Sequence, residues 1–272
     1  MNWFTDRHCF LLAVIVYGVS TVHAVFLWRK GFRRDDHVSY ALLAGAFVFH
    51  TLAMLKRGMT LQSCPVNNLY EATTFIVWSI VLAFLVVGVW RRLRFLGAFA
   101  SPVLFAVGVF ALMPALDPPH GPKPEFNLAL QSLHAGLIML AYGALGLGAV
   151  AAAMYLTQEH NLKFNKLRAV LSVLPPIQRL ERVTRWLVLV GLVLLGVGLH
   201  LGGRLPRPEG VRFIQDPKVV WSILLWLVCL ALLVLRWRGL SPRRFAWGVS
   251  GMFLFVLLTF WGTNLLSPLH NP

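Results

Sequence analysis

The sequence is poor in charged residues and in cysteine. Charged residues make up 13% of its 272 positions, whereas a soluble domain carries roughly 25%. Only ten residues are acidic. The three cysteines, Cys9, Cys64 and Cys229, show no C-x-x-C spacing, so the pattern of a zinc site, a thioredoxin-like redox motif or a disulfide scaffold is missing. These shortages exclude a soluble domain and make cysteine chemistry an unlikely basis for function.

Apolar residues dominate instead, and their composition is typical of a membrane protein. They account for 58% of the chain, the mean hydropathy is +0.70, and there are 22 Gly and 10 Trp. Aromatic residues anchor helices at membrane interfaces, and glycine is common in membrane helices. The net charge of +15 comes from Lys and Arg that punctuate apolar runs. We therefore expect a lipid bilayer as the surroundings and no nucleic-acid partner.

Eight apolar runs are long enough to cross a bilayer, for which a helix needs about 20 mostly apolar residues. We predict an all-α, polytopic transmembrane helix bundle of about eight spans, formed by a single integral membrane domain over residues 1–272. The predicted spans are about 8–28, 38–56, 70–90, 95–116, 128–156, 184–202, 217–236 and 243–266.

The distribution of basic residues predicts the orientation of these spans. Seventeen of the 25 Lys and Arg residues lie in the connections between spans 1 and 2, 3 and 4, 5 and 6, and 7 and 8. Cytoplasmic loops carry such an excess. We therefore expect both termini on the extracytoplasmic side of a bacterial-type inner (plasma) membrane.

Two further patterns predict local structure. Leu167, Val170, Leu171 and Leu174 recur at helical spacing, which predicts a short cytoplasmic helix lying on the membrane surface over about residues 162–174. In the fifth span, small residues recur every four positions, a spacing that lets a neighbouring helix approach closely. These small residues are Ala144, Gly148 and Ala152.

Nine histidines in so apolar a chain are the clearest functional signal, because ionisable groups in membrane helices usually face a cavity or a ligand. With a rise of 1.5 Å per residue, His134, His200 and His270 fall near the outer surface, and His50 falls in the outer half of span 2. Two imidazoles from different helices at one depth are what a six-coordinate haem iron requires. The alternative for each is a solvated or hydrogen-bonded interfacial histidine.

The outer connection between spans 6 and 7 is basic where orientation does not require it. An anionic ligand such as the propionates of haem would explain the excess, with Arg212 and Lys218 facing the carboxylates; solvated loop charge is the alternative. Asp216 is placed to cap the N-terminus of span 7 ahead of Pro217. The aromatic residues Phe213 and Trp221 could cover a porphyrin face. The basic residues are Arg204, Arg207, Arg212 and Lys218.

The segment that opens span 3 has the spacing of a capping box. Asn68 is followed three residues later by Glu71, so each side chain can satisfy a free backbone N–H group at the helix start. That structural role is sufficient for both residues. The alternative for Glu71 is an ion pair with Arg57 or Lys56.

Four blocks of sequence resemble the cytochrome c assembly protein family of haem-handling membrane proteins, and they extend from residue 64 to the C-terminus. The blocks are Cys64–Glu71, similar to the family's P-x-x-N-L-Y-E segment; Leu133-His134 with Leu140-Ala141-Tyr142, similar to its histidine helix; Asp216-Pro217-Lys218 with Trp221 and Trp226; and Gly262–Leu266 with Leu269-His270, similar to its G-V-N-L-L…L-H terminus. The family's tryptophan-rich loop is represented by residues 209–216, which keep Gly210, Phe213 and Asp216 but contain no Trp.

The resemblance implies that haem b is held at the outer face, with His134 and His270 as ligands of the iron. Together with the basic loop and its aromatic neighbours, we predict a site that also includes Arg212, Phe213, Asp216, Lys218 and Trp221. The resemblance further implies a factor in c-type cytochrome assembly that works with apocytochrome c and a second membrane subunit. We expect the chain to be no enzyme by itself, at most a subunit of a holocytochrome c synthase. The alternatives are a HemX-like membrane regulator of haem biosynthesis and a small-anion transporter using Arg204, Arg207 and Lys218.

Overall fold

The computed structural model describes residues 5–30, 36–61, 68–118, 128–164, 177–205 and 213–265, and its regular structure in these ranges is entirely helical. This confirms the predicted all-α fold. The α-helices are α1 (Asp6–Lys30), α2 (Asp36–Leu61), α3 (Leu69–Gly88), α4 (Leu96–Ala111), α5 (Leu128–Phe164), α7 (Ile177–Gly202), α8 (Pro217–Trp237) and α9 (Pro242–Leu265). Three short 3-10 helices, η1 (Arg91–Leu93), η2 (Pro114–Leu116) and η3 (Phe213–Gln215), accompany them.

Each predicted span coincides with one α-helix. Within the described ranges, six of these helices are long and apolar enough to cross a membrane, namely α1, α2, α3, α5, α7 and α8. The chain is therefore a multi-pass membrane protein. In α9 the apolar stretch of side chains is described only as far as Leu257.

Several predicted boundaries were wrong, and the errors have physical causes. The fourth span was expected to continue to 116, but α4 ends at Ala111 because Pro114 lacks an N–H group and restricts the residue before it. In contrast, α5 continues to Phe164 and α7 begins at Ile177, since charged residues beyond the apolar core are good helix formers. The predicted surface helix lies outside the described residues beyond Phe164.

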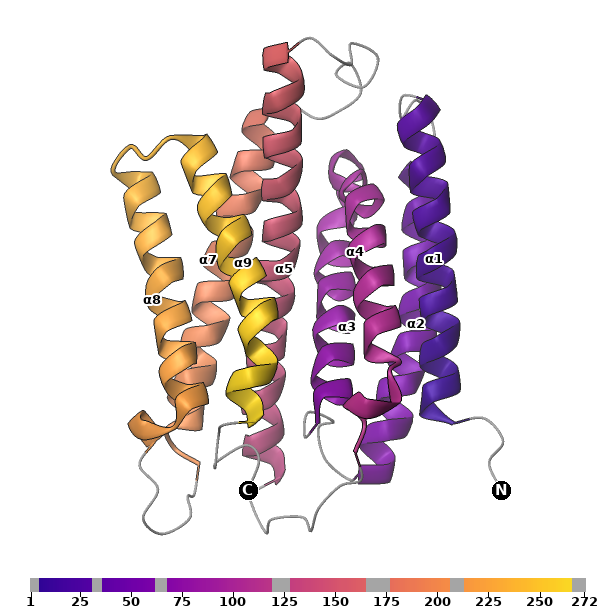
Figure 1. Cartoon of the computed structure of the whole chain (residues 1–272), viewed down its shortest axis with the longest axis vertical. Helices are drawn as coiled ribbons and strands as arrows, with labels where there is room; N and C mark the ends of the chain where they lie inside the picture. Colours follow the sequence, from indigo (N-terminus) through magenta and orange to yellow (C-terminus); the bar gives the residue numbers. More distant parts are fainter. Residues whose placement is uncertain are drawn as a thin grey trace.

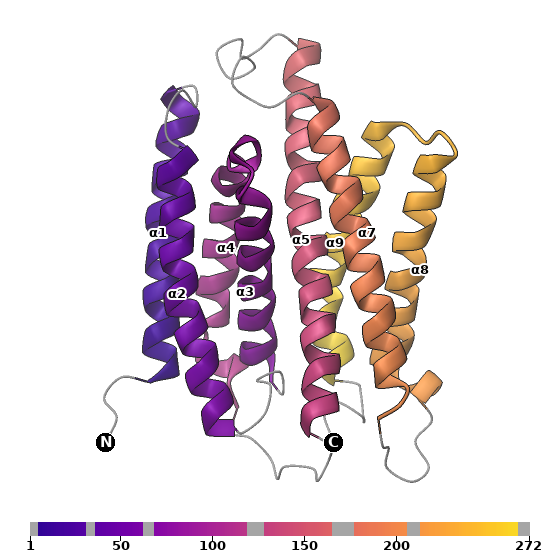
Figure 2. The same ribbon diagram turned by 180° about the vertical axis from the view of Figure 1, so that it is seen from behind.

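The eight α-helices form two groups side by side (Figures 1 and 2). The N-terminal group contains α1, α2, α3 and α4, and the C-terminal group contains α5, α7, α8 and α9. Helix α5 joins the groups, because it packs on α3 of the first and on α7 and α9 of the second. The core therefore runs through α5, whose residues 141–152 are all buried.

Glycines on α5 allow both of its closest helix contacts. A Cβ atom at Gly143 would collide with the backbone of Ser79 on α3, at 2.6 Å from its carbonyl carbon. On the other side, a Cβ atom at Gly148 would lie 3.3 Å from Cβ of Leu187 on α7, with Ala144 and Ala152 buried beside it. The close approach predicted from the small-residue spacing therefore occurs, and α7 is the partner helix.

The helices alternate in direction, so α1, α3, α5 and α8 begin at the end of the bundle where α2, α4, α7 and α9 finish (Figure 1). We call this the His134 end, after the residue in the second turn of α5. The start of α1 and the last turn of α9 both lie there, as an even number of crossings requires. The extracytoplasmic orientation of this end stays a prediction from the basic residues.

Candidate functional site

His134 lies at the start of α5 against the last turn of α7. Its Nδ1 atom is 2.7 Å from the carbonyl oxygen of Gly198. Because a carbonyl oxygen only accepts hydrogen bonds, Nδ1 must carry a proton, and in the neutral ring the lone pair is then on Nε2. This is the arrangement in which histidine ligates metals, with the other ring nitrogen bonded to a backbone carbonyl that fixes the tautomer and the ring orientation.

Glycine on α7 makes this position of the ring possible. A Cβ atom at Gly202 would lie 2.7 Å from Cε1 of His134 and 3.0 Å from Nδ1. The imidazole therefore occupies the space in which any other residue at 202 would place its side chain. Gly198 and Gly202 are four positions apart, so they form one face of α7 that both receives the ring and binds it.

Lys218 and Asp216 lie at the start of α8, at the same end of the bundle. The Asp216 carboxylate is 1% exposed and accepts hydrogen bonds from the backbone N–H groups of Lys218 and Val219, at 2.9 and 3.2 Å. The predicted N-cap with Pro217 in the first turn is confirmed. Lys218 is partly buried and lies within electrostatic range of His134. The structure thus brings a cation and an imidazole together from α8 and α5.

The predicted aromatic residues have different surroundings. The Phe213 ring approaches the end of α7, since a Cβ atom at Gly203 would lie 3.8 Å from it. Trp221 packs on Phe255 of α9, with ring centroids 4.5 Å apart, and its buried indole N–H has no hydrogen-bond partner among the described residues. Arg212 and His270 lie outside the described residues, so one of the two predicted iron ligands is placed.

The two histidines that sequence depth left as alternatives are not part of this site. His200 is exposed, and it lies two residues from both Gly198 and Gly202, hence on the opposite face of α7. His50 is fully buried. Its Nδ1 is 2.9 Å from the Tyr17 hydroxyl and its ring centroid is 4.8 Å from that of Phe10, both on α1.

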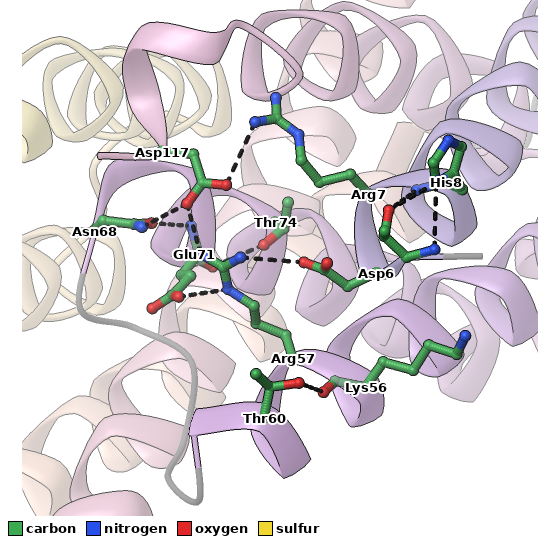
Figure 3. A network of polar contacts seen from close by, with 11 residues as sticks. Asp6, Arg7, His8, Lys56, Arg57, Thr60, Asn68, Glu71, Thr74 and Asp117 are labelled. Carbon is green, nitrogen blue, oxygen red and sulfur yellow. Dashed lines mark hydrogen bonds and ion pairs between the residues drawn. The ribbon is translucent and has the colours of Figure 1, made fainter. Parts of the chain in front are cut away.

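A second polar cluster at the His134 end involves the N-terminal group of helices (Figure 3). We call it the Arg57 cluster. The Arg57 guanidinium contacts three carboxylates: Glu71 at 2.7 Å, Asp117 at 2.5 Å and Asp6 at 3.3 Å. Arg7 adds a second cation, 3.4 Å from Asp117. The cluster therefore connects the start of α1, the end of α2, the start of α3 and the segment after α4.

Tyr70 forms the floor of the Arg57 cluster. Its buried ring lies 5.1 Å from the guanidinium carbon of Arg7 and 5.5 Å from that of Arg57. Aromatic faces attract cations at such distances. Asn68 donates a hydrogen bond of 2.8 Å to Asp117, so the N-L-Y-E segment contributes three residues to the cluster: Asn68, Tyr70 and Glu71.

The capping-box prediction is confirmed for Asn68, whose side chain accepts from the backbone N–H of Glu71 at 2.8 Å. The alternative role of Glu71, an ion pair with Arg57, also occurs. Sequence reasoning did not predict the participation of Asp6, Arg7 and Asp117. The available signal was that these charges stand at predicted outer span ends in a chain with only ten acidic residues.

A small apolar cavity lies between the two groups of helices. Its volume of about 10 Å³ holds about one water molecule, so it is far too small for a porphyrin. Its lining residues come from α3, α4, α5 and α9: Thr73, Ile76, Val107, Tyr142, Phe253, Val256 and Leu257.

Comparison with known protein families gives one match that covers most of the chain. The family described as Cytochrome C assembly protein matches residues 66–270. This chain belongs to the cytochrome c assembly protein family. Membership supports a role in the assembly of c-type cytochromes. The matched region contains His134, the N-L-Y-E segment and the start of α8, and it ends at His270.

Individual members of the family align with most of the chain. Protein NrfI of Wolinella succinogenes is 30% identical over 249 residues, which are 86% of this chain but 26% of NrfI. The chain therefore spans about a quarter of the length of that relative. Cytochrome c biogenesis protein CcsA of Prochlorococcus marinus is 27% identical over 81% of this chain and 78% of its own length, and CcsA of Trieres chinensis is 24% identical over 96% and 93%.

The residues at the His134 end fit the haem that membership in the cytochrome c assembly protein family implies. Among the described residues, no group of three or more His, Cys, Asp or Glu is arranged to hold a metal ion. A single imidazole with a free lone pair suits an iron whose equatorial ligands are supplied by a porphyrin. The Lys218 ammonium suits a propionate, and Trp221, three residues later on α8, has a buried indole N–H with no hydrogen-bond partner among the described residues.

Proposed function

We propose that this protein binds haem b at the His134 end and presents it on the extracytoplasmic side of a bacterial inner membrane during c-type cytochrome assembly. The observation that carries the proposal is the hydrogen bond from His134 Nδ1 to the Gly198 carbonyl. It leaves Nε2 as the atom with the lone pair in the neutral ring, which is held between two helices.

Each residue of the site has a separate task in this proposal. His134 and His270 would hold the haem iron, and Gly198 and Gly202 orient the ring of His134. Lys218 and Arg212 neutralise the propionates, while Asp216 holds the start of α8 so that Lys218 keeps its position. Phe213 and Trp221 shield the apolar faces of the ligand.

The chain positions its ligand and supplies no nucleophile of its own. When bound, haem supplies the vinyl groups to which cysteine thiols of apocytochrome c attach. The imidazoles would hold the iron, and Lys218 and Arg212 would bind the propionates. Attachment then requires apocytochrome c and a second membrane subunit, so the chain acts as part of a holocytochrome c synthase and not as a separate enzyme.

Optical spectroscopy of the detergent-solubilised protein tests the proposal. The native protein should show a low-spin, six-coordinate haem spectrum, because two imidazoles are strong axial ligands. His134→Ala and His270→Ala should each give a five-coordinate spectrum or lose haem. His200→Ala is the matched control, since it removes an exposed histidine from the same end. Native spectra in both ligand variants would overturn the assignment, and loss only in His200→Ala would move the ligand to α7.

A reporter fused after Pro272 tests the orientation. The basic residues predict extracytoplasmic activity of this fusion, and a second fusion after Arg238, in the connection between α8 and α9, should be cytoplasmic. The reversed result would place the His134 end in the cytoplasm and would contradict presentation of haem to an exported apocytochrome.

A further inference from the structure

A basic cluster at the opposite end of the bundle has no part in the proposed haem site. It consists of His37 in the first turn of α2, Arg91 in η1 and Arg94 immediately after η1. We call it the His37 cluster. Its three side chains come from two separate stretches of the chain and meet at the ends of α2 and α3, far along the helices from His134.

The hydrogen-bond donors of the His37 cluster outnumber the acceptors that its own side chains offer. Arg91 approaches Nε2 of His37 at 2.7 Å, and Arg94 approaches Nδ1 at 2.8 Å. A neutral imidazole has one acceptor nitrogen, and a protonated one has none. At least one guanidinium therefore faces an N–H group of the ring, and three basic side chains gather at one place.

Arg94 is held in this position by contacts of its own. Its Nε donates a hydrogen bond of 2.8 Å to the Gly88 carbonyl at the end of α3, and its guanidinium carbon lies 4.5 Å from the centroid of the Tyr40 ring. The entropy of ordering this long side chain is thus already lost before any ligand binds. Neither Arg91 nor Arg94 forms an ion pair with a carboxylate among the described side chains.

The depth of the His37 cluster corresponds to the level of lipid headgroups. The apolar span in α2 begins at His37, and the one in α3 ends at Gly88. Trp90, which precedes Arg91 in the sequence, is 64% exposed, as expected of an anchor at the membrane interface. Basic pockets between membrane helices bind anionic lipid headgroups at this level.

We propose that the His37 cluster binds the phosphate group of an anionic phospholipid. The phosphate oxygens accept hydrogen bonds from both guanidinium groups and from the imidazole N–H, which removes the clash between donors. Arg is suited to this role because its planar fork matches phosphate oxygens. The lipid then ties the start of α2 to the turn between α3 and α4.

Native mass spectrometry of the full chain in neutral detergent, titrated with dioleoylphosphatidylglycerol, tests the proposal. The double variant Arg91→Gln, Arg94→Gln should bind the lipid about 25-fold more weakly, at about fivefold for each basic group lost near the headgroup. The matched control is Arg238→Gln, Arg244→Gln, which removes two exposed charges from the same end and should leave affinity within about twofold.

Three results would overturn the proposal. An equal loss of affinity in the control pair would mean that net charge alone attracts the lipid. Equal binding of dioleoylphosphatidylcholine, which has a phosphate but no net charge, would exclude selection of anionic lipid. Displacement of the lipid by millimolar inorganic phosphate would identify a site for free phosphate instead. Arg91 is exposed, so Arg91→Gln alone should stay folded and give the fivefold step if the double variant does not.

Discussion

The two groups of helices differ most in the polar contacts at their His134 ends. In the N-terminal group, polar side chains pair between helices: Tyr17 with His50, Ser20 with Ser101, and the Arg57 cluster at one end. Close contacts at glycine occur in both groups: in the N-terminal group Gly88 receives Tyr40 of α2 and Gly108 receives Val14 of α1, and the C-terminal group has three further examples. Gly191 receives Leu145 of α5, Gly196 receives Trp226 of α8, and Gly248 receives Leu232 of α8.

This difference has a functional consequence. Where polar side chains satisfy one another, as in the Arg57 cluster, no group is left for a ligand. In the C-terminal group the polar residue His134 bonds to backbone instead, and its second nitrogen stays available. In the proposed function the C-terminal group therefore holds haem, and the N-terminal group supports it.

The family match follows this division only in part. It begins at residue 66, so α1 and α2 lie outside it. Arg7 and Arg57, which come from these two helices, nevertheless bind Glu71 and Asp117 inside the matched region, and Asp6 pairs with Arg57. The first two helices are thus attached to the family domain by charge.

The largest expected effect comes from a substitution at the contact between α3 and α5, which joins the two groups of helices. Gly143→Leu places a side chain against the Ser79 backbone, which cannot move without separating α3 from α5. We expect a cost well above the roughly 1–3 kcal/mol of ordinary overpacking and therefore no monodisperse protein in size-exclusion chromatography. Gly136→Ala is the control, since its Cβ atom would meet nothing within 4 Å. A monodisperse Gly143→Leu protein would show that the crossing is not tight.

Arg57→Gln removes the central cation of the Arg57 cluster and leaves the residues of the proposed haem site unchanged. It leaves the buried Glu71 carboxylate and Asp117 without their main cation, for which about 3–5 kcal/mol is typical. Thermal unfolding in detergent should show a markedly lower Tm. The second replacement Glu71→Gln should recover part of the loss, because one uncompensated charge is removed. An additive double variant would mean that the two side chains do not interact.

Gly202→Ala tests the C-terminal group, in which Gly202 leaves room for the His134 ring. The new methyl group would displace the His134 ring and weaken its bond to Gly198. Loss of the hydrogen bond that orients a metal-binding histidine costs about tenfold to a hundredfold in metal affinity. Haem retention should therefore fall, while Tm stays near that of the native protein. Gly251→Ala, whose Cβ atom would have open space, should retain haem. Unchanged haem retention in Gly202→Ala would show that the position of the His134 ring does not affect haem binding.

Tyr17→Phe is expected to have the smallest effect. It removes one hydrogen bond to His50, worth about 1 kcal/mol, and leaves a buried nitrogen unpaired. Tm should fall slightly, and Tyr17→Phe combined with His50→Leu should be less destabilising than the sum of the single changes. Haem spectra should not change in either protein, since this pair belongs to the supporting group. A spectral change would make His50 part of the site.

Much of the fold could be predicted from the sequence, because length and apolarity decide where membrane helices lie. The eight runs, the small-residue face of α5 and the Asp216 cap are all local patterns of this kind. The end of α4 was missed since the effect of Pro114 was not weighed. The Arg57 cluster was missed for another reason: its members lie up to 111 positions apart in sequence, from Asp6 to Asp117, and only the packing of four helices brings them together.

The site was predictable to the same extent. His134 and Lys218 stand out by residue type and depth, whereas the contribution of Gly198 and Gly202 depends on how α7 is rotated against α5. No periodicity in either helix alone gives that rotation. The glycine spacing at 198 and 202 was a usable signal, since it marks a face where another helix or a ring comes close.

The short helix α4 affects the bilayer around the protein. Its 16 residues span about 24 Å, against a hydrocarbon thickness of about 30 Å. Lipids next to its exposed residues Phe105 and Val109 must therefore thin locally to match it. Asp117 follows α4 after the short helix η2, so we expect this thinner stretch of bilayer to bring water and headgroups close to the Arg57 cluster.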